Sequence, residues 1–93
     1  MASQRYSVER NEKWSCFSSI SNRFLFPFQE KKEYEAWRFK EYGPRRASVN
    51  QAVTMSFEDA LAFAERNCGR EHISGNLREI GFEQIEIDTF FIS

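Results

Sequence analysis

A capped amphipathic helix over residues 56–67 is the feature of this chain that most constrains its fold. Ser56 is a favourable N-cap, Asp59 stands three residues later as in a capping box, and Gly69 follows as a helix breaker. Apolar residues recur at helical spacing between these ends: Phe57, Ala60, Leu61 and Ala64. We expect the helix to pack this apolar face on a mostly antiparallel sheet.

Alternation of apolar and polar residues predicts the strands of this sheet. The residues alternate in this way over positions 5–10, and Asn11-Glu12 is a plausible turn after them. Residues 14–20 fit either a strand face or a helical face. We favour a strand there because serine-rich segments form helices poorly.

The most apolar stretch, residues 24–28, is predicted to be an edge strand. Pro27 cannot donate to a sheet ladder, so the strand would lie at an edge or end at the proline. Three aromatic side chains point the same way if the segment is extended: Phe24, Phe26 and Phe28. Aligned phenylalanines on an edge strand either pack over a helix or form an exposed aggregation hazard.

The middle of the chain allows two interpretations. Aromatic and charged residues alternate over residues 35–42, which favours a strand that turns at residues 43–46 and returns over residues 48–55. The competing interpretation is a helix over residues 30–42 that the following glycine and proline end.

Towards the C-terminus, residues 74–81 are predicted to form a short helix and residues 82–92 a terminal strand. The sequence therefore predicts a single small α+β domain over residues 1–93, with an antiparallel sheet of about four to five strands and one main helix packed on one face. Residues 1–4 are expected to be loose or disordered.

Charged and aromatic residues are distributed unevenly along the chain. Residues 1–46 carry ten Lys and Arg against six Asp and Glu, a net +4, whereas residues 47–93 carry three against eight, a net −5. Ten of the fifteen aromatic residues also lie in the first half. The chain has no apolar run long enough to span a bilayer and no apolar signal core, so we expect a cytoplasmic protein whose Cys16 and Cys68 are free thiols.

The residue types that usually carry chemistry do not converge on a recognisable motif. Cys68 and His72 approach the spacing of metal ligands, but Gly69 breaks the helix that would align them. A Cys–His nucleophile would pair His72 with Cys68 or Cys16, and neither thiol lies in a sequence context that would activate it. The four glycines are scattered and form no phosphate loop, and no pair of carboxylates stands out. We therefore predict a non-enzyme with no catalytic, cofactor-binding or metal-binding residues.

Macromolecular binding accounts better for the basic, aromatic first half. Protein interfaces are enriched in aromatic residues and arginine, and the predicted binding hot spot contains Trp37, Arg38, Phe39, Tyr42, Arg45 and Arg46. The main alternative is a single-stranded nucleic acid, because bases stack on aromatic rings and phosphates attract Arg and Lys. Self-association as a homodimer, through residues 24–28 or 90–92, is a further possibility, and no membrane partner is expected.

Three segments within residues 37–88 form a further pattern: Trp37-Arg38-Phe39, the run from Gln51 to Glu65, and Gly81-Phe82-Glu83. This pattern resembles that of small phage-encoded inhibitor proteins that bind host machinery, such as inhibitors of bacterial RNA polymerase. In those proteins a hairpin leads into an acidic-Ala-Leu helix and then a Gly-Phe-Glu strand. Residues 56–67 also resemble a helix in a small accessory subunit of respiratory complex I. Both resemblances imply a non-catalytic inhibitor or subunit that docks onto a larger complex.

Overall fold

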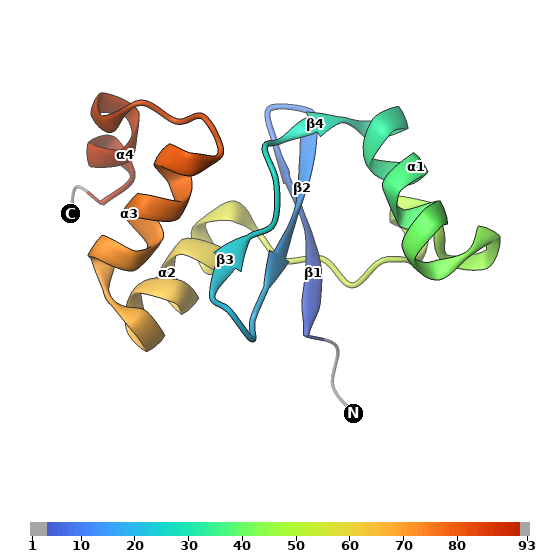
Figure 1. Cartoon of the computed structure of the whole chain (residues 1–93), viewed down its shortest axis with the longest axis horizontal. Coiled ribbons are helices and arrows are strands. Elements are labelled where there is room, and N and C mark those ends of the chain that lie inside the picture. Colours follow the sequence, from blue (N-terminus) through green and yellow to red (C-terminus); the bar gives the residue numbers. More distant parts are fainter. Residues whose placement is uncertain (1–3, 92–93) are drawn as a thin grey trace.

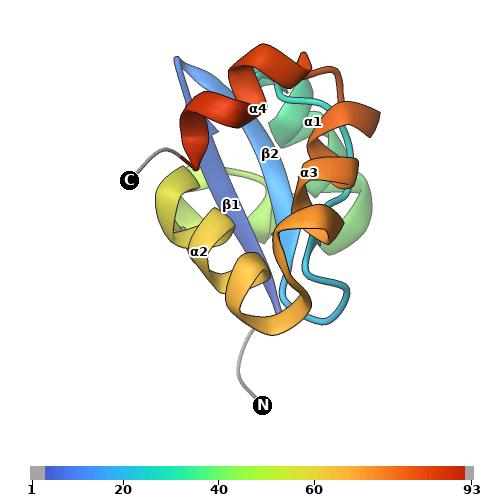
Figure 2. The same ribbon diagram turned by 90° about the vertical axis from the view of Figure 1, so that its left-hand side faces the viewer.

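A small antiparallel sheet separates the molecule into two sides (Figure 1). This computed structural model describes residues 4–91, and within them the sheet has four strands. Strands β1 (Arg5–Arg10) and β2 (Lys13–Ser18) form a hairpin, and the short strands β3 (Arg23–Phe24) and β4 (Gln29–Glu30) both pair antiparallel with β2. Figure 2 shows three helices in front of the sheet, α2 (Phe57–Cys68), α3 (Arg70–Glu79) and α4 (Gln84–Phe90), and helix α1 (Lys31–Tyr42) behind it.

The β1–β2 hairpin confirms the first strand prediction and its turn. Asn11 and Glu12 have positive φ angles of 52° and 66°, the backbone that matches the twist of a tight hairpin, and asparagine adopts it with little strain. The predicted strand over residues 14–20 is also confirmed, although β2 ends at Ser18.

The apolar stretch after β2 does not form one continuous edge strand. The chain bulges away from β2 between β3 and β4, around a proline that has no N–H to donate, and side-chain alternation is lost there. Phe24 and Phe28 pack with α2–α4, whereas Phe26 packs on the opposite face of the sheet. The prediction that these three rings point the same way is therefore wrong.

Helix α1 (Lys31–Tyr42) decides the ambiguous middle segment in favour of the helical interpretation. Tyr34 and Arg38 are buried and Trp37 is half-buried, so the inward residues follow i, i+3, i+4 spacing rather than strand alternation. Gly43, at a φ of 86°, ends the helix and donates its N–H to the Phe39 carbonyl at 2.9 Å.

The predicted return strand over residues 48–55 is wrong. Two short 3₁₀ helices, η1 (Pro44–Arg46) and η2 (Val49–Gln51), occupy the connection, and the chain then runs beside β1. The contact is one parallel bridge. The Ser7 N–H donates to the Val53 carbonyl at 2.8 Å, and the Ser7 carbonyl accepts from the Met55 N–H at 3.1 Å.

Helix α2 (Phe57–Cys68) confirms the helix predicted from its caps. The Ser56 hydroxyl accepts from the Asp59 N–H at 3.0 Å, and Gly69, at a φ of 90°, donates its N–H to the Glu65 carbonyl at 2.8 Å.

The remaining helices, α3 (Arg70–Glu79) and α4 (Gln84–Phe90), differ from the predictions. Helix α3 begins earlier than expected, directly after Gly69. Helix α4 replaces the predicted terminal strand, which is therefore wrong. At the start of α4 the Glu86 carboxylate accepts from the Glu83 N–H at 3.1 Å, as in a capping box. Ile92 of that predicted strand, and residues 1–3 of the expected loose N-terminus, lie outside the described residues.

Each face of the sheet has its own hydrophobic cluster. The larger cluster, beneath α2–α4, comprises Val8, Phe17, Phe24, Phe57, Ala60, Leu61, Ala64, Ile73, Leu77, Ile80 and Ile87. The smaller cluster, beneath α1, comprises Cys16, Tyr34 and Val49, with Trp14, Phe26 and Trp37 packed against it. The α+β class and the antiparallel sheet are thus as predicted, but the single main helix fits only in part because helices cover both faces.

A buried side chain closes the β3 edge of the sheet. Asn76, on α3, accepts from the Phe24 N–H at 2.7 Å and donates to the Phe24 carbonyl at 3.0 Å. One amide side chain thereby makes both hydrogen bonds that a further strand would have made.

Candidate functional site

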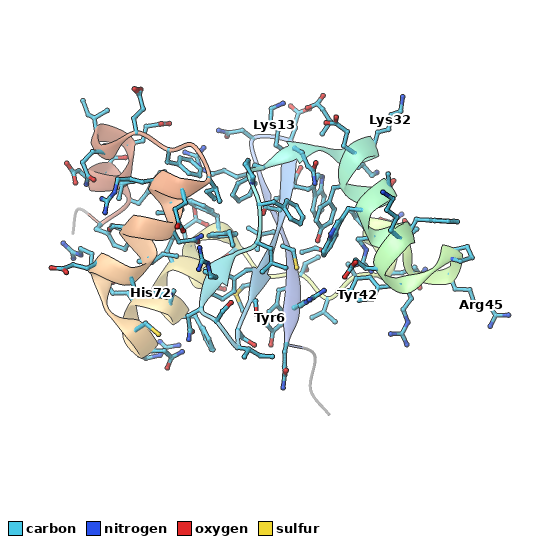
Figure 3. The ribbon with its side chains drawn as sticks, in the orientation of Figure 1. Tyr6, Lys13, Lys32, Tyr42, Arg45 and His72 are labelled. Carbon is cyan, nitrogen blue, oxygen red and sulfur yellow. The ribbon has the colours of Figure 1, made fainter. Side chains whose placement is uncertain are left out.

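The six residues of the predicted hot spot lie close in sequence, but only three of them line the same hollow. Trp37 belongs to the smaller cluster, with its ring 4.9 Å from that of Phe26 and 5.7 Å from that of Tyr34. Phe39 lies on the outside of α1 and is 54% exposed. Arg45, in η1, is also exposed, and in Figure 3 it projects from the end of the molecule, away from the sheet.

The other three residues of the hot spot meet in an open hollow of about 440 Å³. Tyr42 lies on the side of α1 and η1 that faces the sheet (Figure 3). Two more segments complete the lining: Arg5 at the start of β1, and the stretch after η2. The full lining is Arg5, Arg38, Tyr42, Arg46, Gln51, Ala52 and Val53. We call this set the arginine hollow.

Four residues that line the arginine hollow were missed by sequence analysis: Arg5, Gln51, Ala52 and Val53. Arg5 lies 33 positions before Arg38, and no local pattern links them; only the placement of α1 behind β1 brings them together. Val53 was assigned to a strand, yet it is 53% exposed and forms an apolar part of the wall.

Arg38 is the most unusual group in the arginine hollow, because its side chain is charged and only 8% exposed. One terminal nitrogen donates to the Arg46 carbonyl at 2.6 Å, and the guanidinium lies 5.0 Å from the centre of the Tyr42 ring. Its Nε is buried and has no hydrogen-bond acceptor in the described part of the chain. Within residues 4–91, no carboxylate lies at ion-pair distance from this guanidinium.

A buried polar network lies beneath Arg38. The hydroxyls of Ser7 and Tyr34 form a hydrogen bond of 2.6 Å. Burial raises the pKa of the Tyr34 hydroxyl to about 12, and the Ser7 hydrogen bond and the Arg38 charge offset part of this rise. Burial likewise raises the pKa of the Cys16 thiol to about 11, against the opposing charges of Arg5 and Arg38.

The arginine hollow has an excess of positive charge. Arg5 forms an ion pair with Glu41 at 3.2 Å and donates to the Tyr42 hydroxyl at 3.4 Å. Three arginines line the hollow, and pairing with one glutamate leaves a net +2. Positive charge in a concave site raises the local concentration of anions, so the hollow is suited to an anionic group.

The Cys68 and His72 pair has the geometry of a structural contact. The Nε2 atom of His72 lies 3.1 Å from the Ser21 carbonyl and 3.0 Å from the Asn22 carbonyl, so it carries the proton and donates. The Cys68 sulfur accepts from the Asn22 side chain at 3.3 Å. No group of three or more His, Cys, Asp or Glu residues in the described part of the chain is arranged to hold a metal ion.

The surfaces considered for self-association are partly covered. The Phe24 backbone is occupied by Asn76, and Phe90 is half-buried, with its ring 5.1 Å from that of Phe57 and 5.5 Å from that of Phe82. Homodimer formation stays a prediction. None of the described helices combines the length and the apolar character needed to cross a membrane.

No protein-family model, curated protein or solved structure matches this chain. The resemblance to small phage inhibitors therefore stays a prediction. Two of the elements on which it rests are not strands here, because Trp37–Phe39 lies in α1 and Gly81-Phe82-Glu83 leads into α4.

Proposed function

We propose that this protein is a non-enzymatic protein-binding module whose binding surface consists of the arginine hollow and the exposed ring of Phe39. Its occupant would be a segment of a larger protein that carries both an anionic and an apolar group. The cytosol is the proposed location, where Cys16 and Cys68, which form no disulfide, would remain reduced.

The observation that carries this proposal is the convergence of Arg38, Tyr42 and Arg46 with Arg5 and Val53 on one open hollow. Arginine and tyrosine are enriched at the centres of protein interfaces, where they combine a polar end with a large contact area. Phe39 and Val53 add exposed apolar surface on the same half of the molecule. Such surface beside fixed charges is typical of a binding site rather than of a solvated helix.

The burial of the aromatic rings favours a protein partner over a single-stranded nucleic acid. Stacking of bases requires exposed ring faces. In the basic first half, Phe17, Phe24 and Tyr34 are fully buried, and other rings pack against one or other hydrophobic cluster: Tyr6, Trp14, Phe26, Phe28 and Trp37. Most of the aromatic rings that alternate with basic residues in the sequence are therefore used in packing, and Phe39 is the exposed exception.

Two kinds of protein partner fit this surface. The resemblance to phage inhibitors predicts a component of host or defence machinery, and the accessory-subunit alternative predicts a neighbouring subunit of a larger complex. Both are protein partners and both would use the same surface.

Affinity capture with matched variants tests the proposal. Phe39→Ala and Val53→Ala alter the proposed surface, and Ile85→Ala alters an apolar residue on α4 that is more exposed than either. We expect the wild type and Ile85→Ala to capture the same partner protein. With this partner purified, at least one of the two surface variants should bind it with a binding free energy weaker by about 2 kcal/mol. Equal binding by all four proteins would refute the assignment.

A further inference from the structure

We infer that the arginine hollow binds a phosphate monoester on the partner protein, that is, a phosphorylated side chain. This inference rests on the proposed protein-binding function for its partner, but the phosphate site itself can be tested separately.

Arg38 carries a buried charge that has no carboxylate partner within residues 4–91. A guanidinium stays ionised in proteins, and a buried charge is normally paired with an opposite charge. Here the guanidinium is nine-tenths buried, and its neighbours are the Arg46 carbonyl, the Tyr42 ring and the Tyr34 hydroxyl. These three neutral groups compensate part of the charge. An oxyanion in the hollow that Arg38 lines would compensate the rest.

The net charge of the hollow also favours a phosphate monoester. The three lining arginines and Glu41 sum to +2. A phosphate monoester carries about −1.5 to −2 at neutral pH, whereas a carboxylate or a phosphodiester carries one negative charge. A monoester therefore matches the net charge of the hollow, and a nucleic-acid backbone matches it less well.

The donors and the space in the hollow suit a phosphate group as well. Arginine forms paired, charge-assisted hydrogen bonds with phosphate oxygens, and the three arginines come from β1, α1 and η1. The Tyr42 hydroxyl and Gln51 add neutral polar groups, and Val53 adds an apolar wall. A hollow of about 440 Å³ is larger than a phosphate group, so it has room for the side chain that carries the phosphate.

Phenyl phosphate is the probe for this site. Binding to the full-length protein would be measured by calorimetry at constant ionic strength, with benzoate and a short single-stranded oligothymidine as comparison ligands. We expect saturable binding of phenyl phosphate, and weaker binding of both comparison ligands. No saturable binding, or equal binding of benzoate or of the oligothymidine, would overturn the inference.

Two adjacent arginines provide a matched pair of variants. Arg46 lines the hollow and Arg45 does not, and both are exposed, so each can be replaced by alanine with the same loss of charge. Arg46→Ala should weaken phenyl phosphate binding about tenfold, the effect of losing one charge-assisted hydrogen bond, and Arg45→Ala should weaken it less than about twofold. Equal weakening would mean general electrostatic attraction and would overturn the site.

The outcomes separate this inference from the proposed function. If a captured partner still binds after phosphatase treatment, the phosphate inference fails and the protein-binding function stands. Phenyl phosphate binding that depends on Arg46 would support the phosphate site. If, in addition, no captured protein binds less tightly to Phe39→Ala or Val53→Ala, the phosphate site stands and the protein-binding function fails.

Discussion

On one side of the sheet, α2, α3 and α4 enclose a cluster built from aliphatic and phenylalanine side chains. On the other side, α1 covers a smaller cluster that contains the Cys16 thiol and the Tyr34 hydroxyl, and the buried Arg38 lies on the same helix. Groups that stabilise a fold are concentrated on the first side, while the second keeps a buried charge that a purely structural helix would not need. Departures of this kind are expected where function sets the residue.

The largest expected effect in this comparison comes from truncating the larger cluster. Leu77, on α3, is fully buried, and Leu77→Ala should lower the free energy of unfolding by about 3 kcal/mol, because it removes packed methyl groups and leaves a cavity. Val49→Ala, in the smaller cluster, should cost about 1.5 kcal/mol. Urea denaturation followed by circular dichroism measures both. A larger effect at Val49 would contradict the division between the two sides.

The next effect concerns the polar group on the larger side. Asn76→Ala should cost about 2 kcal/mol, since the Phe24 N–H and carbonyl would lose their partners at a buried position. Asn50→Ala, at an exposed position, is the matched control and should change stability by less than about 0.5 kcal/mol. Similar urea midpoints for the two variants would show that the edge contact adds little.

A smaller effect is expected beneath α1. Tyr34→Phe removes the hydroxyl bonded to Ser7 while keeping the ring, and should cost about 1 kcal/mol. Tyr42→Phe removes a hydroxyl whose hydrogen bond with Arg5 is long and exposed, so the same urea measurement should show less than about 0.5 kcal/mol. Equal losses would mean that the buried network is no stronger than the exposed one.

The last prediction is a pH dependence that arises on the α1 side. Native pKa values are raised from 9.0 to about 11 for Cys16 and from 10.0 to about 12 for Tyr34, so the unfolded chain loses these protons at lower pH than the native protein. The contribution of these two groups to the free energy of unfolding should therefore be constant below pH 9 and should fall as the pH rises towards 12. Urea midpoints measured across this range should fall less steeply in a Cys16→Ala/Tyr34→Phe double variant. An unchanged slope would contradict the assignment.

The parts of the fold that local signals define could be predicted from the sequence. Helix α2 was predictable because Ser56 and Gly69 mark its ends, and the β1–β2 hairpin because alternation and a short turn occur together. For helix α1 the sequence leaves a strand and a helix open and favours the strand, because Trp37 and Phe39 alternate with charges. Only Trp37 of these two faces the sheet, and the helical spacing of Tyr34, Trp37 and Arg38 is equally present in the sequence.

The site was predictable only as a region. Arg38, Tyr42 and Arg46 of the predicted set line the hollow. Trp37 is used in packing instead, and Arg5 comes from a distant strand. A burial preference cannot reveal a buried arginine, since arginine is normally assigned to the surface. Helix α4 was missed because Ile85 and Ile87 alternate like a strand, although the Glu83 and Glu86 pair is a helix-start signal.

The Asn76 contact with Phe24 joins residues that are 52 positions apart, and this separation has a consequence for handling the protein. The β3 edge is closed only while α3 is docked, so any state with α3 detached exposes backbone groups beside an apolar stretch. Such edges template pairing between molecules. Refolding yield should therefore depend on protein concentration, and dilution during renaturation should protect the chain until its C-terminal helices have reached the sheet.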